Sequence, residues 1–136
     1  MMGLLMLHDV LVWPIWCKLQ VANQALAALD KFEYVDADFI GYFDSPPPTT
    51  TAMTNVCISA YKKNGQALLI AVNTSRTNAS GQVTINPGVL GLPAAVKAAG
   101  WPDNSPVSVS NNCFQLSLDG LDYQMLLVTG LNSKGK

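Results

Sequence analysis

Charged residues are scarce in this 136-residue sequence, at 12% of the chain against about 25% in ordinary soluble domains. Eight basic and nine acidic side chains leave a net charge of −1. This balance excludes a surface that could neutralise a row of nucleic-acid phosphates. Apolar residues make up 49% of the chain, which excludes an intrinsically disordered segment. We therefore expect a folded domain that does not bind nucleic acid.

Long hydrophobic runs are also missing. No uninterrupted apolar stretch approaches the ~20 residues that span a bilayer, so we expect no membrane partner. The apolar opening residues lack the basic start of a signal peptide, and His8-Asp9 interrupt them. The sequence alone assigns no cellular compartment.

The residue types that usually carry catalysis and metal binding are few. His8 is the only histidine, and the three cysteines (Cys17, Cys57 and Cys113) show no CxxC spacing. We therefore predict no zinc site and no cofactor. The sequence has no GxSxG, HExxH, P-loop or GxGxxG motif, so it predicts no catalytic residue. Cys57 and Cys113 lie in apolar strand-like runs, where free thiols are the simplest interpretation.

Charge is divided unevenly along the chain. Residues 1–45 carry a net charge of −4, and residues 46–136 carry +3. Three prolines follow Ser45, and consecutive prolines favour an extended segment that cannot continue a helix. We therefore divide the chain into an N-terminal segment (1–45), a Pro/Thr-rich linker (46–55) and a C-terminal domain (56–136).

The N-terminal segment follows the order strand, helix, strand. Residues 3–13 form a continuous apolar run that is typical of a buried strand. Residues 18–32 have apolar positions at helical spacing, and residues 36–43 are a short aromatic strand candidate. This order is typical of a βαβ unit in a parallel sheet. Its apolar surface needs a partner, so we expect residues 1–43 to form a homodimer, to bind a separate barrel subunit, or to pack on the chain's own C-terminal domain.

The C-terminal domain alternates apolar residues with a period of two. The alternation over 56–61 is followed by Asn64-Gly65 and a second apolar run, which predicts a β-hairpin. Further strands are predicted over 82–86, 107–110, 114–118 and 122–128. These short strands predict a fold that is mainly β, an antiparallel β-sandwich preceded by the short strand-helix-strand segment.

Two groups of residues combine an aromatic ring with polar side chains, the pairing that sugar sites use. They are Trp101 with Asp103 and Asn104 in one loop, and Trp13 with His8 and Asp9 near the start of the chain. We take these six as candidate carbohydrate-binding residues. The alternative is that Trp101 covers the core and that His8-Asp9 form a buried structural pair. Tyr61 and Tyr123 occupy strand positions, where packing in the core or at its rim is the simpler expectation.

The order of these segments resembles the C-terminal region of large glycoside-hydrolase-like proteins, in which an antiparallel β-sandwich follows a parallel barrel. The similar stretches are LLMLHDV, DADFIGYFDSPPP, the run from VCISAYKKNGQALLIAVN to GVLGLP, and LDYQMLLV. Phe43 stands where such proteins are expected to have tryptophan. The resemblance implies that residues 1–45 are similar to the last strand and helix of a barrel, and that the catalytic carboxylates of such proteins lie upstream of this sequence.

These observations lead to one expected function and two alternatives. We expect a non-catalytic accessory domain related to glycoside hydrolases, with a structural role or weak carbohydrate contact. The first alternative is a small glycoside hydrolase that uses carboxylates of the N-terminal segment, drawn from Asp9, Asp36, Asp38 and Asp44. The second is an interaction module that docks on a separate barrel subunit.

Overall fold

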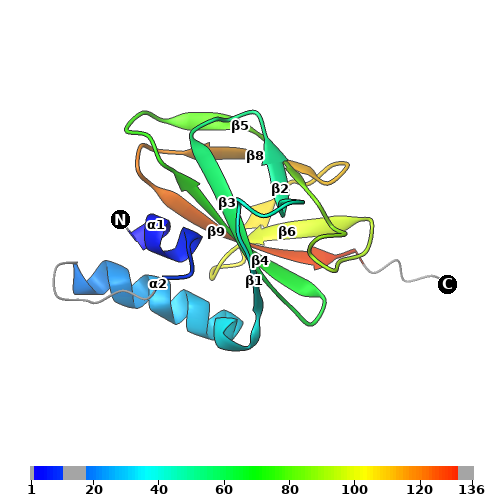
Figure 1. Cartoon of the computed structure of the whole chain (residues 1–136), viewed down its shortest axis with the longest axis horizontal. Coiled ribbons are helices and arrows are strands. Elements are labelled where there is room, and N and C mark those ends of the chain that lie inside the picture. The colour runs from blue at the N-terminus through cyan, green and yellow to red at the C-terminus, as the bar shows by residue number, and fades with distance from the viewer. Residues whose placement is uncertain (1, 11–17, 132–136) are drawn as a thin grey trace.

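The computed structural model describes residues 2–10 and 18–131, which form two stacked β-sheets with helices on one of them (Figure 1). The larger sheet has the strand order β1-β3-β4-β9-β6-β7, and the smaller sheet has the order β2-β5-β8. Every pair is antiparallel, which confirms the predicted sandwich. The elements are α1 (Met2–Leu7), α2 (Leu19–Phe32), the 3-10 turn η2 (Tyr34–Asp36), β1 (Asp38–Ile40), β2 (Thr49–Thr51), β3 (Val56–Lys63), β4 (Gln66–Asn73), β5 (Ala79–Ile85), β6 (Val96–Gly100), β7 (Pro106–Val107), β8 (Cys113–Leu118) and β9 (Tyr123–Gly130).

Strand β4 is buried on both faces and forms the centre of the fold. Its residues Ala67, Leu69 and Ala71 face the smaller sheet and join one hydrophobic core. The intervening Leu68, Ile70 and Val72 face the helices and join a second core. The molecule therefore has three layers, with a core on each side of the larger sheet. Burial on both faces explains why this strand is apolar without interruption.

The predicted hairpin is confirmed as β3 and β4. Asn64 and Gly65 have φ angles of 47° and 74°, the left-handed conformation that a tight two-residue turn requires. Lys63 and Gln66 are therefore the closing pair of the ladder. The residue types in the turn and the apolar alternation both predict this register.

The strand predicted over residues 3–13 is wrong within the described residues, because Met2–Leu7 form helix α1. A short apolar run fits a buried helix as well as a buried strand, and Met and Leu favour helix, whereas no β-branched residue occurs before Val10. Helix α1 lies close against the larger sheet. A Cβ at Gly3 would come within 2.8 Å of Cβ of Tyr123, so glycine permits this approach.

The helix predicted over residues 18–32 is confirmed as α2, but its buried face differs from the expected one. We expected Leu19, Ala22, Leu26 and Leu29 to face the core. The structure buries Ala22 and Leu29 and exposes Leu19. Three small residues, Ala22, Ala25 and Ala28, lie on the buried face, which lets the helix pack closely on the sheet. The helices thus cover the chain's own sandwich, one of the arrangements expected for residues 1–43.

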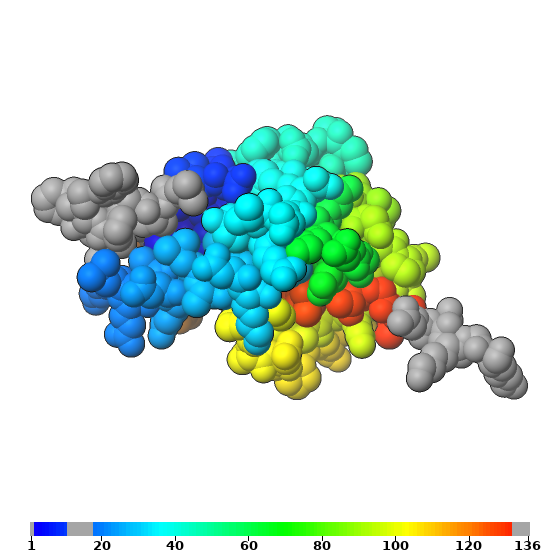
Figure 2. All heavy atoms as spheres, turned by 90° about the horizontal axis from the view of Figure 1, so that it is seen from below, coloured from blue at the N-terminus to red at the C-terminus, as the bar shows by residue number. Residues whose placement is uncertain are grey.

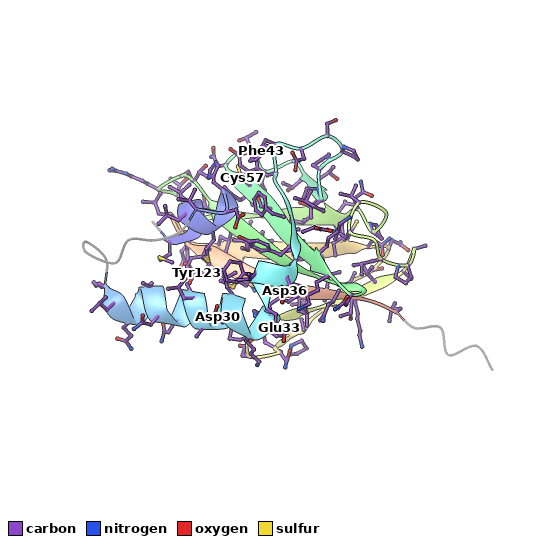
Figure 3. The ribbon with its side chains drawn as sticks, turned by 60° about the horizontal axis from the view of Figure 1, so that its bottom comes forward. Asp30, Glu33, Asp36, Phe43, Cys57 and Tyr123 are labelled. Atoms are coloured by element: carbon purple, nitrogen blue, oxygen red, sulfur yellow. The ribbon has the colours of Figure 1, made fainter. Side chains whose placement is uncertain are left out.

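The strand expected over residues 36–43 is shorter and pairs differently from the βαβ prediction. Only Asp38–Ile40 form β1, and β1 pairs antiparallel with β3 at the edge of the larger sheet. Strand β2 lies within the stretch 46–55 that was expected to be a linker. Strand β6, which the sequence did not predict, occupies Val96–Gly100. The excess negative charge of the N-terminal segment lies at the surface, where Figure 3 shows Asp30, Glu33 and Asp36 near the end of α2.

Candidate functional site: a groove between α2 and β9

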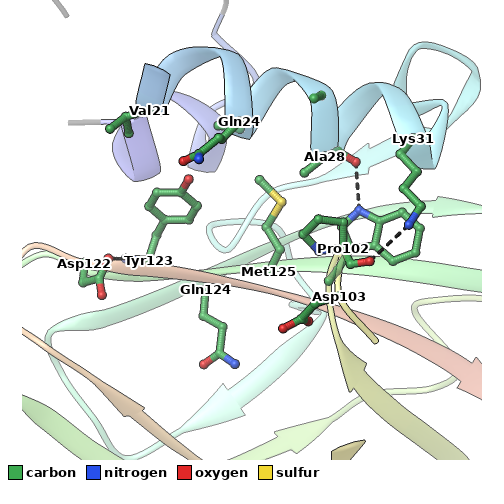
Figure 4. A pocket seen from close by; sticks show the side chains of 13 residues that line it. Val21, Gln24, Ala28, Lys31, Pro102, Asp103, Asp122, Tyr123, Gln124 and Met125 are labelled. Atoms are coloured by element: carbon green, nitrogen blue, oxygen red, sulfur yellow. Dashed lines mark hydrogen bonds between the residues drawn. The ribbon is translucent and has the colours of Figure 1, made fainter. Parts of the chain in front are cut away.

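An open groove with a volume of about 850 Å³ runs between α2 and the start of β9 (Figure 4). Gln24 and Ala28 line it from the helix, and Tyr123 and Met125 line it from the strand. The loop after β6 borders it through Trp101 and the next two residues. Figure 2 shows this loop (yellow) beside the C-terminal part of α2. The groove therefore brings together three segments that are distant in the sequence.

The groove lies where β9 has a strand on one side only. Strand β4 pairs with β9 from Tyr123 onward, whereas β6 pairs with it only from Leu126. A single backbone hydrogen bond of 3.0 Å, from the Trp101 N–H to the Met125 carbonyl, continues the β6 side. The first residues of β9 therefore present an open strand edge to the groove.

Trp101 joins the loop to α2. Its indole N–H donates a 2.8 Å hydrogen bond to the Ala28 carbonyl, and its ring packs edge to face with Phe32 at 6.3 Å between centroids. The side chain is half-buried. Because its only donor is already used, Trp101 can offer a ligand the ring and no hydrogen bond.

Lys31 is also engaged by the same loop. Its Nζ lies 4.9 Å from the centre of the Trp101 ring, a cation–π contact, and donates a 3.1 Å hydrogen bond to the Pro102 carbonyl. The ammonium charge at this end of the groove therefore has partners within the protein.

Of the other two loop residues predicted for the site, one borders the groove. Asp103 lines it, and its Oδ1 accepts hydrogen bonds from the backbone N–H and the hydroxyl of Ser105 at 3.3 Å and 3.2 Å. Asn104 does not line the groove; it has a φ angle of 57° and lies exposed in the turn. The sequence thus predicted two residues that the groove brings together.

Tyr123 was expected to pack in the core or at its rim, and its place at the rim of the core beneath the helices confirms this. It also lines the groove, which the sequence did not predict. Its backbone N–H donates a 2.8 Å hydrogen bond to the Asp122 carboxylate. Burial, with the nearby Asp122 charge, raises the pKa of the Tyr123 phenol. The sequence carried a weak signal for this role, because polar residues flank Tyr123 where β9 begins.

His8 and Asp9 lie away from the groove and have different partners. His8 is exposed, donates from Nδ1 to the Leu4 carbonyl at 2.9 Å, and stacks nearly parallel to Phe43 at 6.3 Å between ring centroids. Its Nε2 lies 3.5 Å from the Tyr42 hydroxyl. The buried His8-Asp9 pair offered as an alternative is therefore wrong, and Trp13, expected beside them, lies outside the described residues.

Asp9 accepts a 2.6 Å hydrogen bond from the hydroxyl of Tyr61. Tyr61 is buried, and burial together with the Asp9 carboxylate holds the pKa of its phenol far above the usual value. The expectation that Tyr61 packs in the core is confirmed. Asp9 therefore fixes the chain after α1 against β3.

The carboxylates considered for hydrolysis lie at the surface, outside the groove. Asp9, Asp36, Asp38 and Asp44 are exposed, and none of them lines the groove. Asp44 accepts a 2.8 Å hydrogen bond from the Gly41 backbone N–H. Asp9 and Asp44 thus have identified structural partners.

The remaining sequence expectations concern thiols, metals and membranes. Cys57 and Cys113 are free and half-buried, and burial raises the pKa of the Cys57 thiol. Within residues 2–10 and 18–131, no three His, Cys, Asp or Glu side chains come together as metal ligands. Neither described helix combines the length and the hydropathy needed to cross a membrane.

Comparisons with known proteins reveal similarity in structure only. No family model matches the sequence, and no curated protein matches it. Among solved structures, an Anoxybacillus alpha-amylase superposes on 88% of the chain with a TM-score of 0.55 and 10% identity. A Bacillus halodurans protein assigned as an alpha-N-acetylgalactosaminidase matches 62% of the chain (TM-score 0.49, 17% identity), and a Clostridium papyrosolvens GH30 endoxylanase matches 60% (TM-score 0.39, 23% identity).

The chain spans only part of these solved structures: 24% of the amylase, 20% of the Bacillus protein and 22% of the endoxylanase. The similarity to the amylase extends over most of the described chain, although few residues are identical. This chain therefore shares its fold with one part of a glycoside hydrolase.

Proposed function

We propose that this chain is a non-catalytic accessory β-sandwich domain related to glycoside hydrolases, and that it contacts carbohydrate through the groove between α2 and β9. Such a domain belongs beside a catalytic domain, in the position that the sequence resemblance implies, after a barrel. The shared fold with a segment of an alpha-amylase supports this lineage. The groove itself is the observation that carries the binding proposal.

The chemistry of the groove suits a sugar. Saccharide rings have an apolar C–H face and a rim of hydroxyl groups, and sites for them combine an apolar surface with a few polar groups. In this groove, Ala25, Ala28 and Met125 are buried and apolar, and Tyr123 and Gln24 supply polar atoms. The groove is open, and no metal ligand set occurs among the described residues, so we expect weak binding with a Kd of roughly 0.1–1 mM.

The surroundings of the N-terminal carboxylates support a non-catalytic role. A glycosidase needs two carboxyl groups on opposite sides of one scissile bond. Asp9 and Asp44 hold local structure, and Asp36 and Asp38 lie exposed outside the groove. These surroundings favour the non-catalytic proposal over the alternative of a small glycoside hydrolase.

Calorimetric titration of the full chain with soluble malto-oligosaccharides and xylo-oligosaccharides tests the binding proposal. We expect a saturable signal in the range given above. A parallel assay with a panel of aryl glycosides tests for hydrolysis and should show no release of the aryl group. Turnover of any glycoside would overturn the non-catalytic proposal. If no oligosaccharide binds at concentrations several times ~1 mM, the carbohydrate-binding proposal is wrong and only the structural role remains.

A further inference from the structure

Two polar side chains of the groove differ from their neighbours. The polar groups of Trp101, Lys31 and Asp103 are engaged by protein partners, as described above. In contrast, the hydroxyl of Tyr123 and the side-chain amide of Gln24 have no hydrogen-bond partner among the described residues. Tyr123 is half-buried and lines the groove, so its side chain can be reached from the groove.

These two groups lie together. Figure 4 shows the Tyr123 hydroxyl and the Gln24 amide pointing toward the same end of the groove, beneath α2. Tyr123 is half-buried, so its ring is held by the surrounding side chains while its hydroxyl stays accessible. The phenol stays protonated at neutral pH, because burial disfavours the charged form. The groove thus offers a fixed hydroxyl and a nearby amide that no other described residue binds.

We propose that Tyr123 and Gln24 are the ligand-contacting residues of this groove, and that they bind an uncharged sugar ring through its hydroxyl groups. Trp101 then has a mainly structural role, because its contacts with Ala28 and Phe32 hold α2 in place. This inference rests on the proposed function, from which it takes carbohydrate as the ligand class.

The charge distribution favours an uncharged ligand. A phenol and a primary amide can each donate and accept a hydrogen bond, as sugar hydroxyls do. The Lys31 ammonium is engaged by Trp101 and Pro102, and the carboxylates of Asp103 and Asp122 accept hydrogen bonds from nearby backbone N–H groups. An anionic ligand would therefore meet two carboxylates that line the groove, and an ammonium group that already has partners.

An extended peptide is the other ligand class that an open strand edge can take. A peptide pairs with a strand edge through its main chain, however, and that pairing makes no use of the Tyr123 hydroxyl or the Gln24 amide. The side chains therefore favour the sugar, and peptide binding becomes an outcome that a test can detect.

The test is a calorimetric titration of the full-length wild-type chain and four variants with maltohexaose and xylohexaose. Tyr123→Phe and Gln24→Ala should each weaken binding by about three- to tenfold, the range expected for one lost hydrogen bond. Tyr42→Phe and Gln20→Ala are matched controls outside the groove, and each should bind like the wild type. The thermal midpoint of Tyr123→Phe should not change, because its hydroxyl has no partner among the described residues.

The outcomes separate this inference from the proposed function. If the wild type binds sugar and Tyr123→Phe and Gln24→Ala bind it equally well, these residue roles are wrong and carbohydrate contact stands. If the wild type binds neither sugar but binds a neutral extended hexapeptide, both proposals are wrong. Should Gln24→Ala fail to fold, amide shift mapping on the wild type decides, since added sugar should shift the residue 24 and 123 amides more than the residue 101 amide.

Discussion

The hydroxyl of Tyr61 donates a 2.6 Å hydrogen bond to the carboxylate of Asp9, across 52 positions of sequence. Tyr61 lies in β3 beneath the helices, and Asp9 lies two residues after the end of α1 in a left-handed conformation (φ 54°). A second hydrogen bond also joins β3 to the end of α1, since the hydroxyl of Ser59 donates to the Leu7 carbonyl at 2.8 Å. The end of α1 is therefore fixed to the sheet by two side chains of one strand.

Replacing Tyr61 by phenylalanine should lower the free energy of unfolding by about 1–2 kcal/mol, because a charge-assisted hydrogen bond is lost while the ring stays packed. Urea unfolding measures the change. Asp9→Asn keeps an acceptor oxygen and serves as the milder comparison, with a smaller expected loss. An unchanged urea midpoint for Tyr61→Phe would mean that the bond adds no stability.

The Glu33–Lys63 ion pair should make stability depend on pH. The hydrogen bond from Lys63, with its charge, holds the pKa of Glu33 below its usual 4.5. Because the folded-state pKa is lowered, the pair stabilises the fold above the unfolded-state pKa, and this contribution is lost as the pH falls through the folded-state pKa. Glu33→Gln should therefore lower Tm slightly at about pH 7 and not at about pH 2. An equal Tm difference at both pH values would contradict the assignment.

Asn73 should be among the least replaceable polar residues. It is fully buried, and its Nδ2 donates to the carbonyls of Thr77 and Asp119 at 2.8 Å and 3.1 Å. Asn73→Ala removes these two bonds and the two that Oδ1 accepts from Ser75, and it should cost about 2–3 kcal/mol in an unfolding titration. Asn73→Asp keeps the shape but buries a charge, so we expect it to be less stable than Asn73→Ala. If Asn73→Asp were more stable than Asn73→Ala, the Nδ2 hydrogen bonds would not be the main contribution of Asn73 to stability.

Gly65 tests the hairpin turn. Gly65→Val should cost about 1–2 kcal/mol, because a β-branched residue is strained at a φ of 74°. Apart from its two chain neighbours, no residue has an atom within 4 Å of a Cβ built there, so the cost comes from the backbone alone. Gly65→Asn tolerates the left-handed conformation and should unfold at nearly the wild-type temperature. Equal melting temperatures for the Val and Asn variants would exclude backbone strain.

Local sequence patterns predicted those elements that a single pattern, such as alternation or helical spacing, was sufficient to identify. The β3–β4 hairpin followed from the alternation that ends at Asn64-Gly65, and α2 followed from its helical spacing. Residues 2–7 were predicted wrongly because a six-residue apolar run has no period that separates helix from strand. Strand β6 was missed because Val96–Gly100 contain two alanines and a lysine, which are weak strand formers.

The groove could be predicted only in part, since it depends on contacts between distant segments. Trp101 and Asp103 are neighbours in sequence, so one loop predicted both. Tyr123 and Gln24 lie 99 positions apart and meet only because α2 packs on the larger sheet. No local sequence pattern predicts how α2 packs on the sheet. The position of β9 beside β4 also depends on pairing at long range.

The edge strands of the two sheets differ in how well they resist pairing with a strand of another molecule. Strands β1 and β2 have three residues each, and β7 has two and includes Pro106, which cannot donate a backbone hydrogen bond. Short strands and prolines hinder edge-to-edge association. Strand β8 has six residues and neither charge nor proline. When the protein is concentrated or partly unfolded, aggregation by strand addition should therefore begin along β8.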